Sequence, residues 1–273
     1  MGPSWRCPNC GFTPEFTNGV LRFHDAANGG FEARFFKDLA RLEPGFWWFE
    51  ARNALIRWAL STYGKPSGDF LEIGCGTGFV AASLAHAFPS WNIAASEFFA
   101  EGLEFVAERI TRASLYQIDA RNLPFSAAFD AIGAFDVIEH IADDRGVLNE
   151  ARRALRDAGL IIITVPQHPF LWSAIDEYTH HERRYTRAEL RLKLEEAGFE
   201  VLLLRSFVSL LMPLLLATRL RPVRGPVDPE AEFRIAPQLN SLLHGVMRLE
   251  GFATRAGFVL PFGGSLLAVG RAR

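Results

Sequence analysis

The sequence predicts an α/β protein with a doubly wound, mostly parallel sheet, and three observations lead to this prediction. Between residues 70 and 207, short apolar runs alternate with stretches in which apolar residues recur at helical spacing, as in parallel strands joined by helices. A glycine-rich loop, Gly74-Cys-Gly-Thr-Gly78, follows the first run and precedes a helical stretch. An acidic residue, Glu97, ends the second run. In such sheets, loops of this kind bind ligands at the carboxyl ends of the strands.

The composition is that of a folded protein and argues against several functional classes. The 273 residues are 49% hydrophobic and 22% charged, with a formal net charge of -2, so the chain can bury a core and we expect no nucleic-acid partner. Three cysteines are too few for a disulfide framework, and the N-terminus shows no secretory signal, so a cytoplasmic location is expected. Aromatic residues make up 12% of the chain, and some of them should line a pocket or meet an apolar partner.

The chain divides into three parts. Residues 1–30 are interrupted by proline and glycine and are expected to form an irregular leader. Residues 31–66 should hold two helices, 31–42 and 46–60, that cap the site. Residues 67–273 form the α/β domain, with an apolar and helical insertion at 208–262 before the last strand. Its expected strands are 70–73, 91–95, 115–118, 131–135, 160–165, 199–207 and 265–269, and its expected helices are 79–88, 100–110, 145–155, 187–197 and 239–255.

The leader contains Cys7-Pro-Asn-Cys10, which is half of a zinc-knuckle motif. A structural zinc ion needs four ligands, and the chain has no second pair of cysteines at this spacing. His24 and Asp25 are the nearest candidates to complete a site. We therefore expect no metal.

The glycine loop predicts a nucleoside ligand that carries no diphosphate. A dinucleotide fingerprint requires G-x-G-x-x-G, whereas here the third glycine comes one residue early and Phe79 stands where the fingerprint has glycine. The Lys-Ser/Thr pair of a Walker loop is absent. Glu97 lies about twenty residues further on, where a carboxylate can accept hydrogen bonds from both ribose hydroxyls.

Four motifs, in this order, resemble those of class I S-adenosylmethionine-dependent methyltransferases. They are Leu71–Gly78, Ser96–Phe98, Gln117–Phe125 and Phe129–His140. The resemblance covers residues 52–207 closely and points to methyltransferases of types 11 and 23, similar to the ubiquinone-biosynthesis O-methyltransferases. It implies S-adenosylmethionine as the cofactor. It also implies a Rossmann-like sheet of seven strands with an antiparallel last strand, capped by N-terminal and C-terminal helical elements.

The resemblance also implies roles for individual residues. Glu97 should bind the ribose, Phe98 should pack on the adenine, and Asp119 should accept a hydrogen bond from the adenine amino group. Phe135 should offer its backbone near the methionyl ammonium group. Arg52 should bind the cofactor carboxylate, with a solvated helix arginine as the alternative. The full set of implied cofactor-binding residues is Arg52, Glu72, Gly74, Cys75, Gly76, Gly78, Glu97, Phe98, Asp119, Ala120 and Phe135.

Two histidines, His140 and His181, are candidates for a catalytic base, which is needed only where the acceptor must lose a proton. His140 follows the expected strand 131–135, and His181 lies in a segment rich in His, Tyr and Arg after strand 160–165. Such side chains over a cofactor can take a proton or hold an anionic acceptor; alternatively, they only attach the segment to the sheet. Adjacent His180 and His181 point opposite ways on an extended chain, which argues against a metal site there.

Two apolar stretches, 201–217 and Phe46–Phe49, can each have more than one role. The run 201–217 is shorter than the roughly 20 residues of a bilayer span. Its second half, Leu210–Leu216, precedes Arg219, Arg221 and Arg224, so it can cover the substrate, join the core, or contact a membrane surface through Leu210–Arg224. The aromatic run Phe46–Phe49 can cover the acceptor pocket or pack on the sheet.

These inferences combine into one expected function. We expect methyl transfer from S-adenosylmethionine to an oxygen of a hydrophobic small molecule, such as a quinone, a lipid or a polyketide-like compound. The choice of oxygen depends on the resemblance to the ubiquinone group. N- or C-methylation is an alternative, as is a membrane-peripheral protein that binds the cofactor without turnover. An aromatic pocket for an apolar acceptor is expected from Phe46–Phe49, Phe98-Phe99, Phe170–Trp172 and Tyr178–Tyr185.

Overall fold

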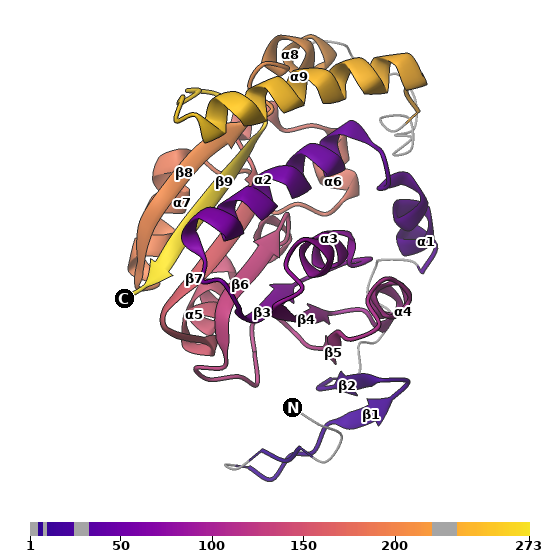
Figure 1. Cartoon of the computed structure of the whole chain (residues 1–273), viewed down its shortest axis with the longest axis vertical. Coiled ribbons are helices and arrows are strands. Elements are labelled where there is room, and N and C mark those ends of the chain that lie inside the picture. The colour runs from indigo at the N-terminus through magenta and orange to yellow at the C-terminus, as the bar shows by residue number, and fades with distance from the viewer. Residues whose placement is uncertain (1–4, 8–9, 25–32, 220–233) are drawn as a thin grey trace.

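The fold is built around one nine-stranded sheet with helices on both faces (Figure 1). The computed structural model describes residues 5–7, 10–24, 33–219 and 234–273. The strands are β1 (Glu15–Thr17), β2 (Val20–Arg22), β3 (Gly68–Ile73), β4 (Trp91–Glu97), β5 (Ser114–Gln117), β6 (Phe129–Phe135), β7 (Leu155–Pro166), β8 (Phe199–Phe207) and β9 (Ser265–Ala272). The helices are α1 (Ala33–Leu42), α2 (Trp47–Tyr63), α3 (Phe79–Ala87), α4 (Ala100–Arg109), α5 (Asp144–Ala154), α6 (Ala174–Tyr178), α7 (Arg187–Glu196), α8 (Met212–Arg219) and α9 (Pro237–Arg255).

The strand order confirms the predicted doubly wound sheet. The order is β1-β2-β5-β4-β3-β6-β7-β9-β8. The strands from β2 to β7 in this order pair in parallel, and β9 pairs antiparallel with both β7 and β8. The chain reverses its direction of winding between β3 and β6, and the carboxyl ends of strands at such a switch point form a crevice for ligands.

The sheet has nine strands instead of the expected seven because part of the N-terminal leader is folded. Asn18 and Gly19 have φ values of 53° and 81° and connect β1 to β2, as in the two-residue turn that Asn-Gly favours. β2 then pairs in parallel with β5, opposite Leu115–Gln117. Buried Leu21 joins the core cluster that contains Tyr116. The expectation of an irregular leader was therefore wrong for residues 15–22.

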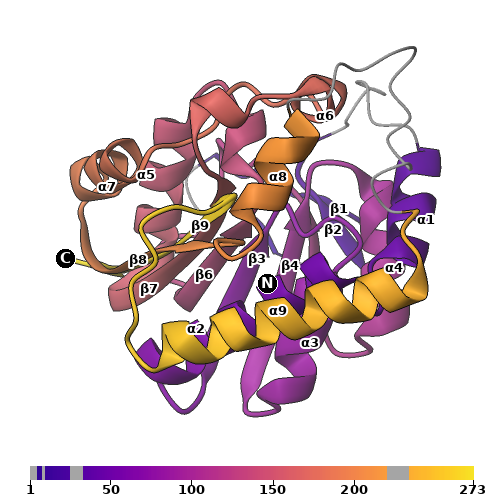
Figure 2. The ribbon, with the colours of Figure 1, turned by 90° about the horizontal axis from the view of Figure 1, so that it is seen from above.

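Two hydrophobic layers hold most of the helices on the sheet, and a smaller third cluster holds α4 through Leu103 and Val106. One layer contains buried residues of α2, α3 and α9 with the sheet residues facing them, and the other layer contains those of α5 and α7. Figure 2 shows α5 and α7 on one side of the sheet and α2, α3 and α9 on the other. The strands between these layers are apolar on both faces, which explains their continuous hydrophobic runs.

The C-terminal insertion forms α8 and α9, and α9 packs on α2. At the start of α8, Leu211 and Met212 are buried, whereas Leu210, Leu214 and Leu216 are exposed. The side chain of Arg219, together with Arg221 and Arg224, lies outside the described part of the chain. Among the helices described, none combines the length and apolar character needed to span a bilayer.

Candidate active site

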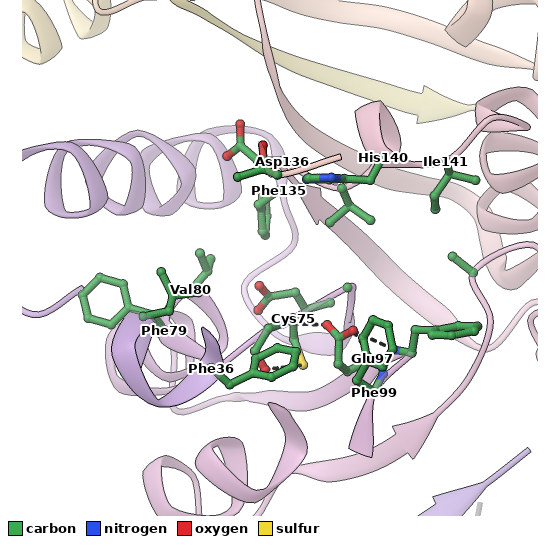
Figure 3. Close-up of a pocket in the computed structure, with 18 of the residues that line it drawn as sticks. Phe36, Cys75, Phe79, Val80, Glu97, Phe99, Phe135, Asp136, His140 and Ile141 are labelled. Atoms are coloured by element: carbon green, nitrogen blue, oxygen red, sulfur yellow. Dashed lines mark hydrogen bonds between the residues drawn. The ribbon is translucent and has the colours of Figure 1, made fainter. Parts of the chain in front are cut away.

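A cavity of about 690 Å³ lies at the carboxyl ends of β3, β4 and β6, beneath α1 and the start of α2. Figure 3 shows Phe135, Asp136 and His140 on one side of it and Cys75, Glu97 and Phe99 on the other. All the predicted site residues except Gly78 line this cavity: Arg52, Glu72, Gly74, Cys75, Gly76, Glu97, Phe98, Asp119, Ala120, Phe135, His140 and His181. Four separate motifs therefore converge on one space.

The glycine loop needs its glycines for two different reasons. Gly74, Gly76 and Gly78 have φ values of 61°, 55° and 74°, a region that side-chain-bearing residues rarely adopt. A Cβ atom on Gly78 would also lie 2.7 Å from Val106, whereas a Cβ on Gly76 would meet nothing within 4 Å. Gly78 therefore lets the loop fit against α4, while Gly76 leaves room for a ligand.

Glu97 anchors the glycine loop from the end of β4. One carboxylate oxygen accepts a hydrogen bond from Gly76 N at 2.8 Å, and the other accepts from Phe98 N at 2.8 Å and Phe99 N at 3.3 Å. Burial raises the pKa of Glu97 even though these hydrogen bonds favour the ionised form. A carboxylate has about four acceptor positions, so Glu97 keeps capacity for a ligand hydroxyl.

Asp119 and Phe98 lie on the expected adenine side of the cavity, and His24, considered above as a possible zinc ligand, lies beside Phe98. Burial alone would raise the pKa of Asp119, but hydrogen bonds from Arg121 lower it, so Asp119 is ionised and can accept. The ring of Phe98 lies 4.5 Å from that of His24, centroid to centroid. His24 lies two residues after the end of β2. The hairpin therefore brings the leader to the edge of the cavity.

Arg52 and Glu72 are buried polar side chains at the opposite end of the cavity. Arg52 donates from Nη1 to Asp136 Oδ2 at 2.6 Å, and its guanidinium carbon lies 4.7 Å from the Trp48 ring centroid. Its Nε and Glu72 Oε2 are buried without a hydrogen-bond partner. Burial raises the pKa of Glu72 to about 8. Arg52 is only 7% exposed, so the alternative of a solvated helix arginine was wrong.

Glu43, between α1 and α2, is a site residue that sequence analysis missed. It is 4% exposed, accepts hydrogen bonds from Thr77 Oγ1 and from Arg109 Nη1, and lines the cavity. These contacts attach the helical cap to the glycine loop. A single glutamate in a connecting segment gives no sequence signal, because its partners come from two distant elements.

His181 is held by a buried carboxylate. Its Nδ1 lies 2.8 Å from Asp176 Oδ1, and Asp176 is fully buried and accepts two hydrogen bonds from Arg184, from Nε at 2.7 Å and from Nη2 at 3.0 Å. Burial opposes ionisation, but the hydrogen bonds from His181 and Arg184 hold the pKa of Asp176 well below its usual range. An ionised carboxylate only accepts hydrogen bonds, so Nδ1 of His181 carries a proton and donates to Asp176.

The structure brings His140 and His181 together, which the sequence did not predict. Their ring centroids lie 4.5 Å apart with the planes nearly perpendicular, and both residues line the cavity. Burial, together with the nearby His181, lowers the pKa of His140 to about 4. His140 is therefore neutral and a weak proton acceptor at pH 7.

Comparison with known proteins identifies the family of this chain. A family model described as a methyltransferase domain matches residues 48–204. The chain belongs to the class I S-adenosylmethionine-dependent methyltransferases. It is 28% identical over 162 residues to a Mycolicibacterium smegmatis protein named a "probable S-adenosylmethionine-dependent methyltransferase", which covers 58% of this chain and 61% of that protein. It is 34% identical over 94 residues to demethylmenaquinone methyltransferase of Thermotoga maritima, covering 34% of this chain and 41% of the relative.

A solved structure shares the fold of this chain. Phosphoethanolamine N-methyltransferase 2 of Haemonchus contortus, solved with phosphomonomethylethanolamine and S-adenosylhomocysteine, superposes with a TM-score of 0.54 at 19% identity. The match covers 81% of this chain and 52% of that one. The chain spans less than two thirds of the length of the curated relatives named above.

The residues of this cavity fit S-adenosylmethionine, the cofactor of the family. Arg52 Nε and Glu72 Oε2, buried without partners, complement the carboxylate and ammonium groups of a methionine moiety. Glu97 and Asp119, at the other end, complement ribose hydroxyls and an adenine amino group. A Cβ atom on Gly76 would project into open space, so the glycine leaves the middle of the cavity clear.

The aromatic residues that line the cavity differ from those expected. Rings that line the cavity come mainly from the cap, the glycine loop and β4: Phe35, Phe36, Trp48, Phe49, Phe79, Phe98, Phe99 and Phe135. Phe170 and Trp172 are absent from its described lining and are 65% and 38% exposed. Tyr185 is fully buried and donates to Asp144 Oδ2 at 2.6 Å. The expectation of a cavity position was therefore wrong for Phe46, Trp47, Phe170–Trp172, Tyr178 and Tyr185, which are absent from the described lining.

One group of side chains in the described residues could hold a metal ion. Potential ligand atoms of Glu139, His140 and His181 all lie within 4.8 Å of one another. Both carboxylate oxygens of Glu139 are buried without a partner, and burial raises the pKa of Glu139 well above its usual range. Cys7 and Cys10 join no such group among the described residues, and Asp25 lies outside them.

Proposed function

We propose that this protein transfers the methyl group of S-adenosylmethionine to a hydroxyl oxygen of a hydrophobic small molecule, such as a quinone, a lipid or a polyketide-like compound. The observation that carries this proposal is the arrangement of one cavity. Its floor is the glycine loop with Glu97, its walls are aromatic, and His181 with its buried partner Asp176 lies at its far side.

Methyl transfer places few chemical demands on the protein. When bound, S-adenosylmethionine supplies an electrophilic methyl group and a neutral thioether leaving group. The protein has to hold the acceptor atom at roughly 3–3.5 Å from that methyl group and exclude water. The rings of Phe36, Trp48, Phe49 and Phe99 line the cavity and suit an apolar acceptor better than a charged one.

A hydroxyl acceptor has to lose a proton as its oxygen attacks, and His181 is placed to take it. Nε2 accepts the proton, and ionised Asp176 stabilises the resulting imidazolium through Nδ1. Arg184 keeps Asp176 ionised. A positioned base of this kind contributes about 10²–10⁴-fold to the rate, which supports an oxygen acceptor over one that loses no proton.

A labelled-methyl assay tests this proposal. Wild-type protein, radiolabelled S-adenosylmethionine and fractionated apolar metabolites should yield a labelled, solvent-extractable product. His181→Ala and Asp176→Asn should lower kcat by about 10²–10⁴-fold with little change in KM or in affinity for S-adenosylhomocysteine. Glu182→Gln, an exposed neighbour in the same segment, is the matched control and should keep full activity.

An acceptor that needs no base makes the test more specific. With a phenol already ionised at the assay pH, the two variants should approach the wild-type rate. Equal losses with ionised and neutral phenols would show that His181 and Asp176 are only structural. Tight binding of S-adenosylhomocysteine without a labelled product from any fraction would contradict methyl transfer and favour a binding protein.

A further inference from the structure

Helix α9 carries apolar side chains on the face that points away from the protein. Leu242, Leu249 and Phe252 are 63%, 63% and 70% exposed, and their spacing of seven and three residues places them on one helical face. The opposite face buries Leu243 and Met247 in the core layer that contains α2. Surface helices normally direct polar residues outward, and a helix that is apolar on both faces calls for a second partner.

Leu242, Leu249 and Phe252 form an apolar stripe, and further exposed apolar residues lie on the elements around it. Figure 2, which looks down on this end of the molecule, shows α8 and α9 in front of the sheet. Further exposed apolar residues precede α8, lie on it, begin α9 and follow it: Leu210, Leu214, Leu216, Leu239, Phe258, Val259 and Phe262. Monomeric soluble proteins rarely expose so many large apolar residues on neighbouring elements.

The exposed charged side chains on α9 itself, Arg248 and Arg255, have one sign. Of the described residues 207–219 and 236–264, only Glu250 is acidic, and it is 1% exposed and accepts hydrogen bonds from Ser209 N and Leu210 N, both at 2.8 Å. Arg248 and Arg255 on α9 are exposed. Anionic lipid head groups complement such a rim, whereas a two-fold contact between copies would bring the same arginines together.

The start of α9 is also connected to the cap of the cavity. Asn240 accepts a hydrogen bond from Trp47 N at 3.0 Å through its side-chain oxygen and donates to Gly45 O at 2.8 Å. Trp48, the next residue, lines the cavity. A partner that binds α9 would therefore lie beside the part of the protein that covers the acceptor.

We propose that the outward face of α9, with the exposed apolar residues beside it, docks on the surface of a bilayer that contains anionic lipids. The leucine and phenylalanine side chains enter the boundary between head groups and acyl chains, and the arginines contact lipid phosphates. Docking needs no methyl transfer, so its test is independent of the proposed function.

Co-sedimentation with vesicles tests this docking. The full-length protein should pellet with vesicles of phosphatidylcholine and phosphatidylglycerol, and less with phosphatidylcholine alone. The combined Leu242→Ser, Leu249→Ser and Phe252→Ser variant should lower the partition coefficient by at least about tenfold. Arg248→Gln should lower it by about fivefold for the anionic vesicles alone.

Two controls keep the result interpretable. Leu192→Ser changes a 51% exposed leucine on α7, on the other side of the sheet, and should pellet as the wild type does. The triple variant should keep the wild-type affinity for S-adenosylhomocysteine, which shows that it is folded. Wild-type protein that stays in the supernatant with every vesicle, or a triple variant that pellets fully, would overturn the proposal. A wild-type dimer that the triple variant abolishes, without vesicle binding, would assign the face to self-association and overturn it as well.

Discussion

Glu97 shows how one side chain can both shape and use a binding site. It accepts three backbone hydrogen bonds, one of them from the glycine loop across the site. A ligand hydroxyl would therefore meet a carboxylate that is already oriented, and little conformational freedom would be lost on binding. Removing this side chain should damage the loop and the ribose contact together.

We therefore expect Glu97→Ala to weaken binding of S-adenosylhomocysteine by about hundredfold, because hydrogen bonds to charged groups are worth roughly 1.5–3 kcal/mol each. Glu97→Gln should fall between this variant and the wild type, since it keeps the shape and loses the charge. Isothermal titration calorimetry measures both, with exposed Glu104→Ala on α4 as the control. Unchanged affinity of Glu97→Ala would remove this residue from the site.

Glu72 predicts a pH effect on stability. Burial raises its pKa from 4.5 to about 8 in the folded protein, so the folded state binds a proton that the unfolded state releases above pH 4.5. Stability that depends on this proton is present at low pH and is lost as the pH rises through about 8.

Glu72→Gln should therefore melt with the wild type near pH 5 and higher than it, by roughly 10 °C, near pH 9 in the absence of ligand. The same variant should bind S-adenosylhomocysteine more weakly. Thermal denaturation across this pH range measures the first effect. A difference in melting temperature that stays the same at every pH would show that protonation of Glu72 does not affect stability.

At the scale of elements, the β1–β2 hairpin extends the sheet at its edge and carries the leader to the cavity. β2 pairs with β5, and His24 stacks near Phe98 just beyond it. Leu21 is 3% exposed in the core, whereas Phe16, on β1, is 47% exposed. The hairpin is therefore attached through one of its faces.

Leu21→Ala should destabilise the protein by about 2–4 kcal/mol, because it leaves a cavity in a packed cluster. Phe16→Ala, the control on the same hairpin, should change the free energy of unfolding by less than about 0.5 kcal/mol. Urea denaturation followed by tryptophan fluorescence compares the two. Equal small effects would mean that the hairpin does not fold cooperatively with the sheet.

At the scale of the whole molecule, Glu139, His140 and His181 come from two segments that meet only in the folded chain. Their ligand atoms lie close enough to make a metal site a real alternative to a proton-transfer site. The sequence predicts no metal. Under the proposed function, His181 acts through its Asp176 partner alone.

Treatment with EDTA followed by gel filtration should therefore leave methyl transfer unchanged, and added zinc or manganese should not raise it. The labelled-methyl assay measures this once an acceptor is found, and elemental analysis of the purified protein gives a readout that needs no acceptor. Activity lost to EDTA and restored by one divalent ion would replace the proton-transfer role with a metal site.

Much of the fold and of the site was predictable from sequence because the signals are local. Strand ends, the glycine loop and the acid that ends β4 follow one another in sequence, and parallel strands bring their carboxyl ends to one edge. The Asn18-Gly19 turn was also a local signal, but its flanking strands of three residues each are too short to show a period. Glu43 and the pairing of His140 with His181 gave no signal, because each depends on a partner dozens of residues away. Asp176 gave none because its burial on the short helix α6 depends on packing.

The sequence by itself determined the family, the doubly wound sheet and the residues around the expected cofactor. Hydrophobic periods of two or 3.6 residues, and turns that need glycine, depend only on residues that are neighbours in the sequence. Only the tertiary structure decided which histidine has a buried carboxylate behind it, which aromatic rings face the cavity, and which face of α9 is left without a partner. Burial and the approach of charges depend on packing between distant segments, and packing sets the protonation of Glu72, His140 and Asp176.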